Sequence, residues 1–133
     1  VEIDLAIQPL IELMTDKHTD VRDWATFSIG TQSEMNTPEI IEALKARLND
    51  SHRMPRVEAI IGLALRKDPC VKEILIEELE NIDDHGSFIL ESIEALEDVD
   101  FIPLIEKQIA KNKVTQQVNE EWLISTLEVL KNE

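Results

Sequence analysis

The stretch DKHTDVRDWATFSIG, residues 16–30, recurs in altered form twice along the chain. It aligns with DSHRMPRVEAIIGLA (residues 50–64) at an offset of 34 residues, and DDHGSFILESIEAL (residues 83–96) follows at an offset of 33. A period of this length is typical of proteins built from repeated supersecondary units. Because one helix pair cannot bury its apolar face alone, such units stack and share a continuous core. The repeat therefore predicts a stack of two-helix units.

Apolar residues recur at helical spacing within these stretches and between them. Thr37-Pro38 and Asp68-Pro69 each combine a capping side chain with a proline in the first helical turn, where its missing N–H costs no hydrogen bond. We expect eight short helices, which begin at or are capped by residues near Ile3, Asp20, Thr37, Pro55, Asp68, Asp84 or Ser87, Asp100 and Asn119.

The composition agrees with an all-helical chain. Glycine is rare, at 3 residues, and tyrosine is absent, whereas strands favour β-branched and aromatic residues. We predict an all-α, right-handed α-α superhelix that forms one domain over residues 1–133. Its four expected units cover approximately residues 1–34, 35–68, 69–99 and 100–133.

The net charge of the chain argues against several classes of partner. The formal net charge is −15, which repels nucleic-acid phosphates and anionic lipid head groups. No apolar run approaches the roughly 20 residues that cross a bilayer, and the first residues, Val1-Glu2-Ile3-Asp4, show no secretory leader. A single cysteine, Cys70, cannot form an internal disulfide. We expect a cytoplasmic protein that binds neither nucleic acid nor membranes.

The repeat resembles the HEAT-like repeats of phycobilisome lyases. The matching pattern is an aspartate, then Val-Arg about five residues later, then alanine, then an aliphatic residue with glycine or alanine, and residues 16–30 and 50–64 carry it best. The patterns of tetratricopeptide and ankyrin repeats are absent. The resemblance implies a ladder of hydrogen bonds in which Asp16 pairs with Arg22 and Asp50 with Arg56. It specifies a fold and leaves the function open.

An Asp-x-His pattern occurs once in each of the three stretches and uses every histidine of the chain: His18, His52 and His85. Carboxylate and imidazole groups are metal ligands. However, neighbouring units stack about 10 Å apart, too far for consecutive imidazoles to share one ion easily. The alternative is that aspartate braces a turn and histidine fills a polar position copied by duplication. We favour the turn and keep the three histidines as metal-ligand candidates.

Two enzymatic alternatives come from families that share HEAT repeats. Deoxyhypusine hydroxylases bind iron through His-Glu pairs, and this chain has no His-Glu dipeptide. A bilin lyase would need basic groups for the propionates of its substrate, and this acidic chain offers few. No phosphate loop, nucleophile elbow or zinc-protease motif is present. We therefore expect no catalytic residue and no cofactor, with a metal-dependent or bilin-lyase-like enzyme as the alternative.

A protein or peptide partner fits the sequence better. On a helical wheel, residues of the second helix in each unit form a mixed acidic and apolar row that would line the concave face of a superhelix. Such a row suits a basic or amphipathic partner; the alternative is that its aromatic residues pack internally and its glutamates are simply solvated. The last helix, with Trp122 and Leu127, is apolar on more than one face, which suggests either that further repeats cover it or that it mediates self-association. The expected partner-binding row consists of Asp23, Trp24, Phe27, Glu58, Ile61, Glu91 and Glu94.

Overall fold

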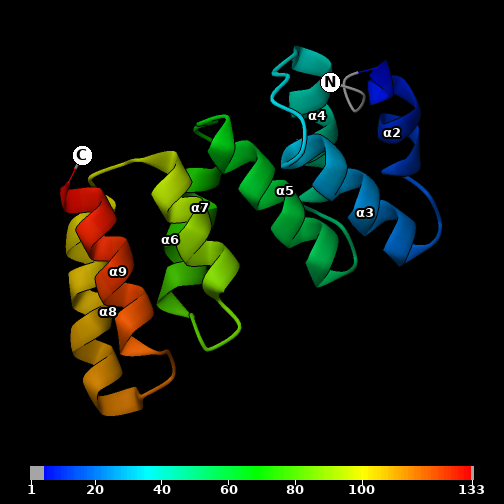
Figure 1. Ribbon diagram of the computed structural model, residues 1–133. Helices are drawn as coiled ribbons and strands as arrows, with labels where there is room; N and C mark the ends of the chain where they lie inside the picture. Colours follow the sequence, from blue (N-terminus) through cyan, green and yellow to red (C-terminus); the bar gives the residue numbers. More distant parts are fainter. Residues whose placement is uncertain (1–4, 133) are drawn as a thin grey trace. The chain divides into compact units, whose positions relative to one another are not determined.

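The computed structural model describes residues 5–132 of the 133 (Figure 1), and within them every regular element is a helix. The predicted all-α class is confirmed. Each pair of consecutive helices forms one repeat, with the second helix of each pair being α3, α5, α7 or α9. The helices are α2 (Ile7–Leu13), α3 (Thr19–Gly30), α4 (Pro38–Arg47), α5 (Arg53–Leu65), α6 (Val71–Glu80), α7 (Ser87–Leu96), α8 (Phe101–Thr115) and α9 (Glu120–Lys131).

The helices group into two compact units. The N-terminal half, residues 1–66, contains α2 to α5, and the C-terminal half, residues 67–133, contains α6 to α9. Each half consists of two helix pairs, and the boundary at residue 66 lies close to the expected border between the second and third repeats. The expectation of one domain over residues 1–133 stays a prediction.

Local sequence sets several helix ends. Thr37 caps α4, because its Oγ1 accepts a hydrogen bond from the Ile40 N–H at 3.2 Å and Pro38 follows at the first helical position. Asn119 caps α9 in the same way through the Glu121 N–H, at 2.9 Å. Both caps were predicted.

Three predicted helix starts are wrong. The N-cap of α3 is His18 and not Asp20, and α5 begins at Arg53, two residues before Pro55. In these two cases the aspartate of the Asp-x-His pattern fixes the preceding turn, so the chain enters the helix directly after the histidine. The N-cap of α6 is Cys70 and not Asp68, because Asp68 Oδ1 accepts from the Cys70 N–H at 2.9 Å and shapes a turn that precedes the helix.

In the N-terminal half, α3 packs closely against α5, α2 packs on α3, and α4 packs on α5. Ala25 and Ala59, small residues at equivalent positions of the two repeats, are fully buried. Gly30 at the end of α3 is buried against α5. A Cβ atom built on Gly62 would lie 2.8 Å from the Cα of Gly30, so the two backbones touch at this point.

A single arginine closes the end of this packed pair. Arg66 follows α5, and its guanidinium donates five hydrogen bonds to backbone carbonyls, each 2.8–2.9 Å long. These bonds satisfy the last carbonyls of α3 and α5 and hold the loop between α3 and α4. Burial lowers the pKa of Arg66 from its ordinary value. The five acceptors are Ile29, Gly30, Ser33, Met35 and Gly62.

In the C-terminal half, α6 packs on α7, α8 on α9, and the second helices α7 and α9 pack side by side. Ser92 is buried on α7, and the equivalent buried residue on α9 is Thr126, 34 residues later, whereas Ser125 is exposed. Thr126 Oγ1 donates a 2.7 Å hydrogen bond to Glu94 Oε2, which ties α9 to α7.

A buried asparagine fixes the connection between α8 and α9. Asn112 Nδ2 donates to the Val118 carbonyl at 2.7 Å, and the Val118 N–H donates to Asn112 Oδ1 at 2.9 Å. The side-chain amide thereby replaces a backbone partner for the loop. Val118 is buried as a result.

Candidate protein-binding surfaces

The three Asp-x-His patterns form the same turn. In each, a carboxylate oxygen of the aspartate accepts a hydrogen bond from the backbone N–H of the histidine two residues later. The distances are 2.8 Å for Asp16 and His18, 2.9 Å for Asp50 and His52, and 2.8 Å for the third pair, Asp83 and His85. This geometry confirms the prediction that the aspartates brace a repeated turn.

The histidine rings do not converge on one another. His18 Nδ1 lies 3.0 Å from Asp16 Oδ1 within its own turn, and His52 Nδ1 lies 3.2 Å from Arg22 Nη2, a cation that would repel a metal ion. Among residues 5–132, no group of three or more His, Cys, Asp or Glu side chains is placed to hold a metal ion. The turn accounts for the pattern without a ligand.

The hydrogen-bonded ladder exists, with pairings that differ from those expected. Arg22 donates through Nε and Nη2 to the two carboxylate oxygens of Asp50, at 2.8 and 3.1 Å, so the side-chain pair joins two successive repeats. Within its own repeat, Arg22 Nη1 reaches the Asp16 carbonyl at 2.9 Å, and Arg56 reaches the Asp50 carbonyl at 2.7 Å. Arg22 thus binds the turn of its own repeat through a backbone carbonyl and the turn of the next repeat through a carboxylate.

The pKa of Asp50, the carboxylate partner of Arg22, is shifted from its ordinary value. Burial alone would raise the pKa of Asp50, but hydrogen bonds from Arg22 and from the His52 N–H, with the charges of Arg22 and Arg47, outweigh burial and lower the pKa to about 2. Arg47 Nη1 approaches the same carboxylate at 2.8 Å. Asp50 is therefore ionised throughout the neutral range and acts as a structural anion.

The partner-binding row predicted from the sequence divides into exposed and buried residues. In the N-terminal half, Trp24 is 54% exposed and Phe27 is 36% exposed, and both lie on α3 one turn apart. Glu58 and Ile61 on α5 are only 6% and 7% exposed. The exposed part of the predicted row in this half is therefore the aromatic pair on α3.

Asp23 lies beside this aromatic pair. Its side chain is half-buried, its Oδ1 atom is buried and accepts no hydrogen bond from the described residues, and burial followed by the charge of Asp20 raises its pKa. A carboxylate in this state gains from a donor or a cation supplied by another molecule.

In the C-terminal half, the predicted residues Glu91 and Glu94 line a pocket of about 250 Å³ between α7 and α9. Trp122, which is 37% exposed, forms part of the opposite wall, on α9. Trp122 was expected to mediate self-association, because its helix is apolar on more than one face, and its place in this pocket was not predicted. The remaining lining residues are Ser87, Leu90, Ser125 and Thr126.

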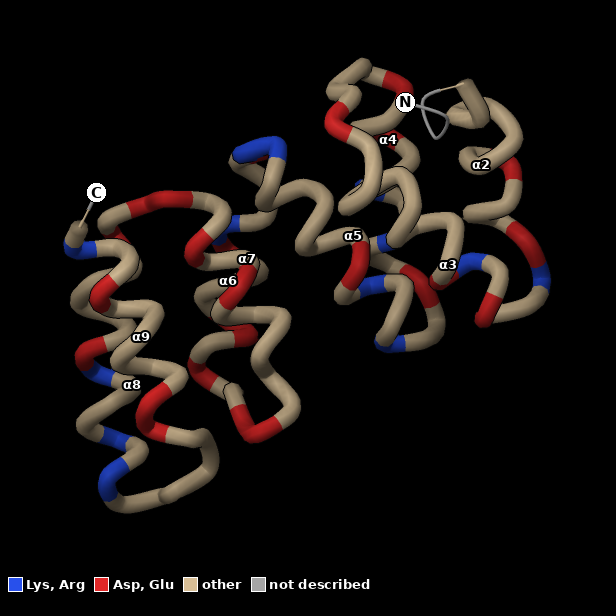
Figure 2. Tube along the Cα trace, in the orientation of Figure 1, with Lys and Arg blue, Asp and Glu red and all other residues tan. Residues whose placement is uncertain are grey.

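Charge is distributed unevenly between the two halves. The N-terminal half carries 7 basic and 11 acidic residues, and the C-terminal half carries 6 basic and 17 acidic residues, a net charge of 6 − 17 = −11. Figure 2 shows acidic positions on α7 and in the loops of this half, with basic positions concentrated on α8. The α7–α9 pocket therefore lies in a strongly negative field that attracts cationic ligands.

The repeat pattern and the stacked helix pairs agree with a comparison to protein families, in which the model for HEAT repeats matches residues 7–97. The chain belongs to the HEAT-repeat family. Proteins of this family generally serve as scaffolds for protein interactions. Within residues 5–132 of this HEAT-repeat chain, every helix is too short or too polar to cross a membrane.

Two curated relatives of this HEAT-repeat chain are the protein YibA of Escherichia coli strain K12 and its counterpart in strain O157:H7. Each is 34% identical to the chain over 102 residues, which cover 77% of the chain and 36% of the relative. The X-ray structure of E. coli YibA matches with a TM-score of 0.81 and 31% identity, and covers 96% of the chain and 44% of YibA. The chain thus spans less than half the length of these relatives.

Proposed function

We propose that this HEAT-repeat chain is a protein-binding scaffold with no catalysis of its own, and that its second helices bind a basic, amphipathic segment of a partner. The observation that supports this proposal most directly is the α7–α9 pocket, where two carboxylates and an indole line one small cavity. A lysine or arginine next to an aliphatic side chain complements that combination of groups.

The α3 surface supports the same chemistry independently. Trp24 and Phe27 offer apolar area, and the half-buried Asp23 carboxylate lies beside them. Solvent-exposed aromatic side chains beside an acidic group are typical anchor positions for partners, because they combine a large contact area with little conformational entropy to lose. We include Glu58 and Ile61 in the proposed row only as its buried support, since both are nearly inaccessible.

The two tryptophans make the proposal testable without knowledge of the partner. Trp24→Phe leaves Trp122 as the only indole, and Trp122→Phe leaves Trp24. Each variant is titrated with an 18-residue amphipathic helix of leucine and lysine and, separately, with its leucine and glutamate counterpart. We expect the lysine peptide to shift the emission of Trp122 and Trp24, and the glutamate peptide to shift neither.

A charge-matched pair of variants separates specific binding from general attraction to an acidic protein. Glu91→Lys with Glu94→Lys should weaken binding of the lysine peptide about tenfold or more, because both changes place cations in the pocket. Glu73→Lys with Glu77→Lys changes the net charge by the same amount at exposed positions of α6 and should have a much smaller effect. Equal effects of the two pairs would refute the α7–α9 site, and equal binding of both peptides would refute the basic partner.

A further inference from the structure

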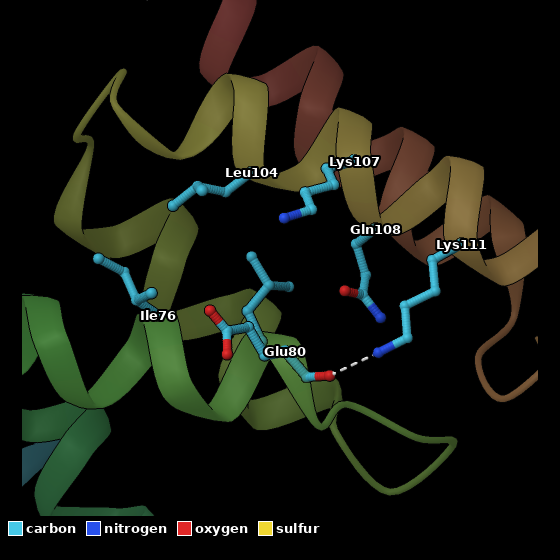
Figure 3. Close-up of a pocket in the computed structure, with 7 residues that line it drawn as sticks. Ile76, Glu80, Leu104, Lys107, Gln108 and Lys111 are labelled. Atoms are coloured by element: carbon cyan, nitrogen blue, oxygen red, sulfur yellow. Dashed lines mark hydrogen bonds between the residues drawn. The ribbon is translucent and has the colours of Figure 1, made fainter.

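A second cavity lies on the opposite helices of the C-terminal half, between α6 and α8. Its volume is about 420 Å³, within the range of roughly 300–1,000 Å³ that small-molecule sites occupy. Leu79 is buried, and Ile76 and Leu104 are half-buried, so the cavity has three aliphatic walls. Its polar lining residues are Glu80, Lys107, Gln108 and Lys111 (Figure 3).

Gln108 is the most informative of these residues. It is only 7% exposed, yet its side-chain amide makes no hydrogen bond with the described residues, and Figure 3 shows the amide directed from α8 into the cavity. The amide therefore presents one hydrogen-bond donor group and one acceptor to the interior of the cavity, with no group of the described residues occupying either. These groups are free to bind a ligand that carries both an acceptor and a donor.

The charged groups at the rim are of both signs. Lys107 extends its ammonium group toward the cavity, as Figure 3 shows, and no ion pair or hydrogen bond engages it within the described residues. Lys111 is anchored, because its Nζ donates to the Glu80 carbonyl at 3.1 Å. The Glu80 side chain provides a carboxylate on the α6 side of the same cavity. A ligand that carries only one charge would leave one of these groups unsatisfied.

We propose that this cavity binds a small aliphatic zwitterion, namely an aliphatic α-amino acid or a dipeptide of such residues. The ligand carboxylate binds Lys107 and the N–H₂ of Gln108, the ligand ammonium binds Glu80 and the carbonyl oxygen of Gln108, and the aliphatic side chain packs on Ile76, Leu79 and Leu104. This assignment uses Glu80, Lys107 and Gln108, leaves Lys111 bonded to the Glu80 carbonyl, and is independent of the proposed protein-binding surfaces on α3, α7 and α9.

The test is calorimetric titration of the full chain with leucine and with leucyl-leucine, compared with leucinamide, which lacks the carboxylate, and N-acetyl-leucine, which lacks the ammonium. We expect binding of the two zwitterions and a loss of about tenfold or more in affinity for each blocked compound. Failure of both zwitterions to bind at 10 mM, about the weakest affinity of interest, would overturn the proposal.

Variants of Lys107 and Glu80 test which side chain binds the carboxylate of the ligand and which binds its ammonium group. Lys107→Gln should weaken leucyl-leucine binding about tenfold and leave the residual binding of leucinamide unchanged, and Glu80→Gln should show the converse pattern with N-acetyl-leucine. Lys113→Gln, on the same helix and paired with Glu120 outside the cavity, is the control. Gln108→Leu should abolish binding, because it removes the amide that pairs with both charged groups of the ligand. Unchanged binding in both Lys107→Gln and Gln108→Leu would also overturn the proposal.

Discussion

Gly30 and Gly62 meet across α3 and α5 so closely that a Cβ atom on Gly62 would lie 2.8 Å from the Cα of Gly30. That distance is shorter than any carbon–carbon van der Waals contact, and the obstructing atom belongs to a backbone that cannot rotate away. The two glycines therefore determine how close the second helices of the first two repeats can approach.

Gly62→Ala should lower the free energy of unfolding by about 1–3 kcal/mol, because the two helices must separate to admit the methyl group. Gly30→Ala should cost less, since its Cβ would lie 3.1 Å from the Cα of Gly62. Urea unfolding followed by circular dichroism measures both. Helix propensity alone would make each change stabilising by about 1 kcal/mol, so an increase in stability for Gly62→Ala would contradict the packing.

Asp50→Asn should destabilise the chain at pH 7 by about 2–3 kcal/mol, toward the low end of the range for removing one partner of a buried ion pair. Because the pKa of Asp50 is lowered in the folded state to about 2, its stabilising effect is complete above pH 4 and is lost as the pH falls toward 2. The stability difference between the two proteins should therefore shrink between pH 4 and pH 2. Glu42→Gln, an exposed carboxylate on α4, serves as the control, and a difference that is constant with pH would contradict the assignment.

Arg66→Lys should lower the free energy of unfolding by about 2–4 kcal/mol, because one ammonium group cannot reach the five carbonyls that the guanidinium holds. Arg56→Lys removes a side chain with one backbone hydrogen bond, to the Asp50 carbonyl, and should have a clearly smaller effect. Thermal unfolding of the two variants compares them directly. Equal losses would mean that Arg66 contributes its charge and not its fork geometry.

Asn112→Ala should destabilise the C-terminal half by about 1–3 kcal/mol, because it leaves the N–H and the carbonyl of Val118 without their partners. Hydrogen exchange gives a residue-specific readout: the Val118 amide should lose its protection while the amides of α3 and α5 keep theirs. Asn119→Ala, which removes only the cap of α9, is expected to cost about 1 kcal/mol and to leave Val118 protected.

The parts of the fold that depend on short-range signals were predicted well. Thr37 and Asn119 cap their helices as expected, because a cap needs only the residue itself and the next three. Pro55 misled the prediction, since proline is tolerated anywhere in the first turn of a helix and the true start is fixed by the hydrogen bond between Asp50 and the His52 N–H.

Features that depend on contacts between repeats were not accessible to the same reasoning. The carboxylate partner of Arg22 is Asp50, 28 residues away, and not Asp16 in its own turn. The sequence contains both candidates, and only the stacking of the repeats selects between them. Likewise the burial of Gly30 follows from the crossing of two helices, which a helical wheel drawn for one helix cannot represent.

The candidate surfaces were predicted in part for a related reason. Trp24 and Phe27 are exposed on α3, whereas Trp122 was expected to mediate self-association because its helix is apolar on more than one face. A pocket between two helices depends on how they pack, which the pattern of either helix alone does not specify. Of the residues that line the pocket between α7 and α9, the sequence therefore predicted only Glu91 and Glu94, on α7.

The Asp-x-His turn has a consequence for protein engineering. The hydrogen bond that shapes the turn uses the backbone amide of the third residue, so the fold requires the aspartate and places no demand on the ring that follows it. The three histidines recur at 34 and 33 residues, and they differ in what else their rings contact. The His18 ring contacts Asp16 of its own turn and the His52 ring contacts Arg22, whereas the His85 ring makes no hydrogen bond with the described residues. A label or cross-linker attached at position 85 would therefore use the repeated turn as a support without removing a contact of the scaffold.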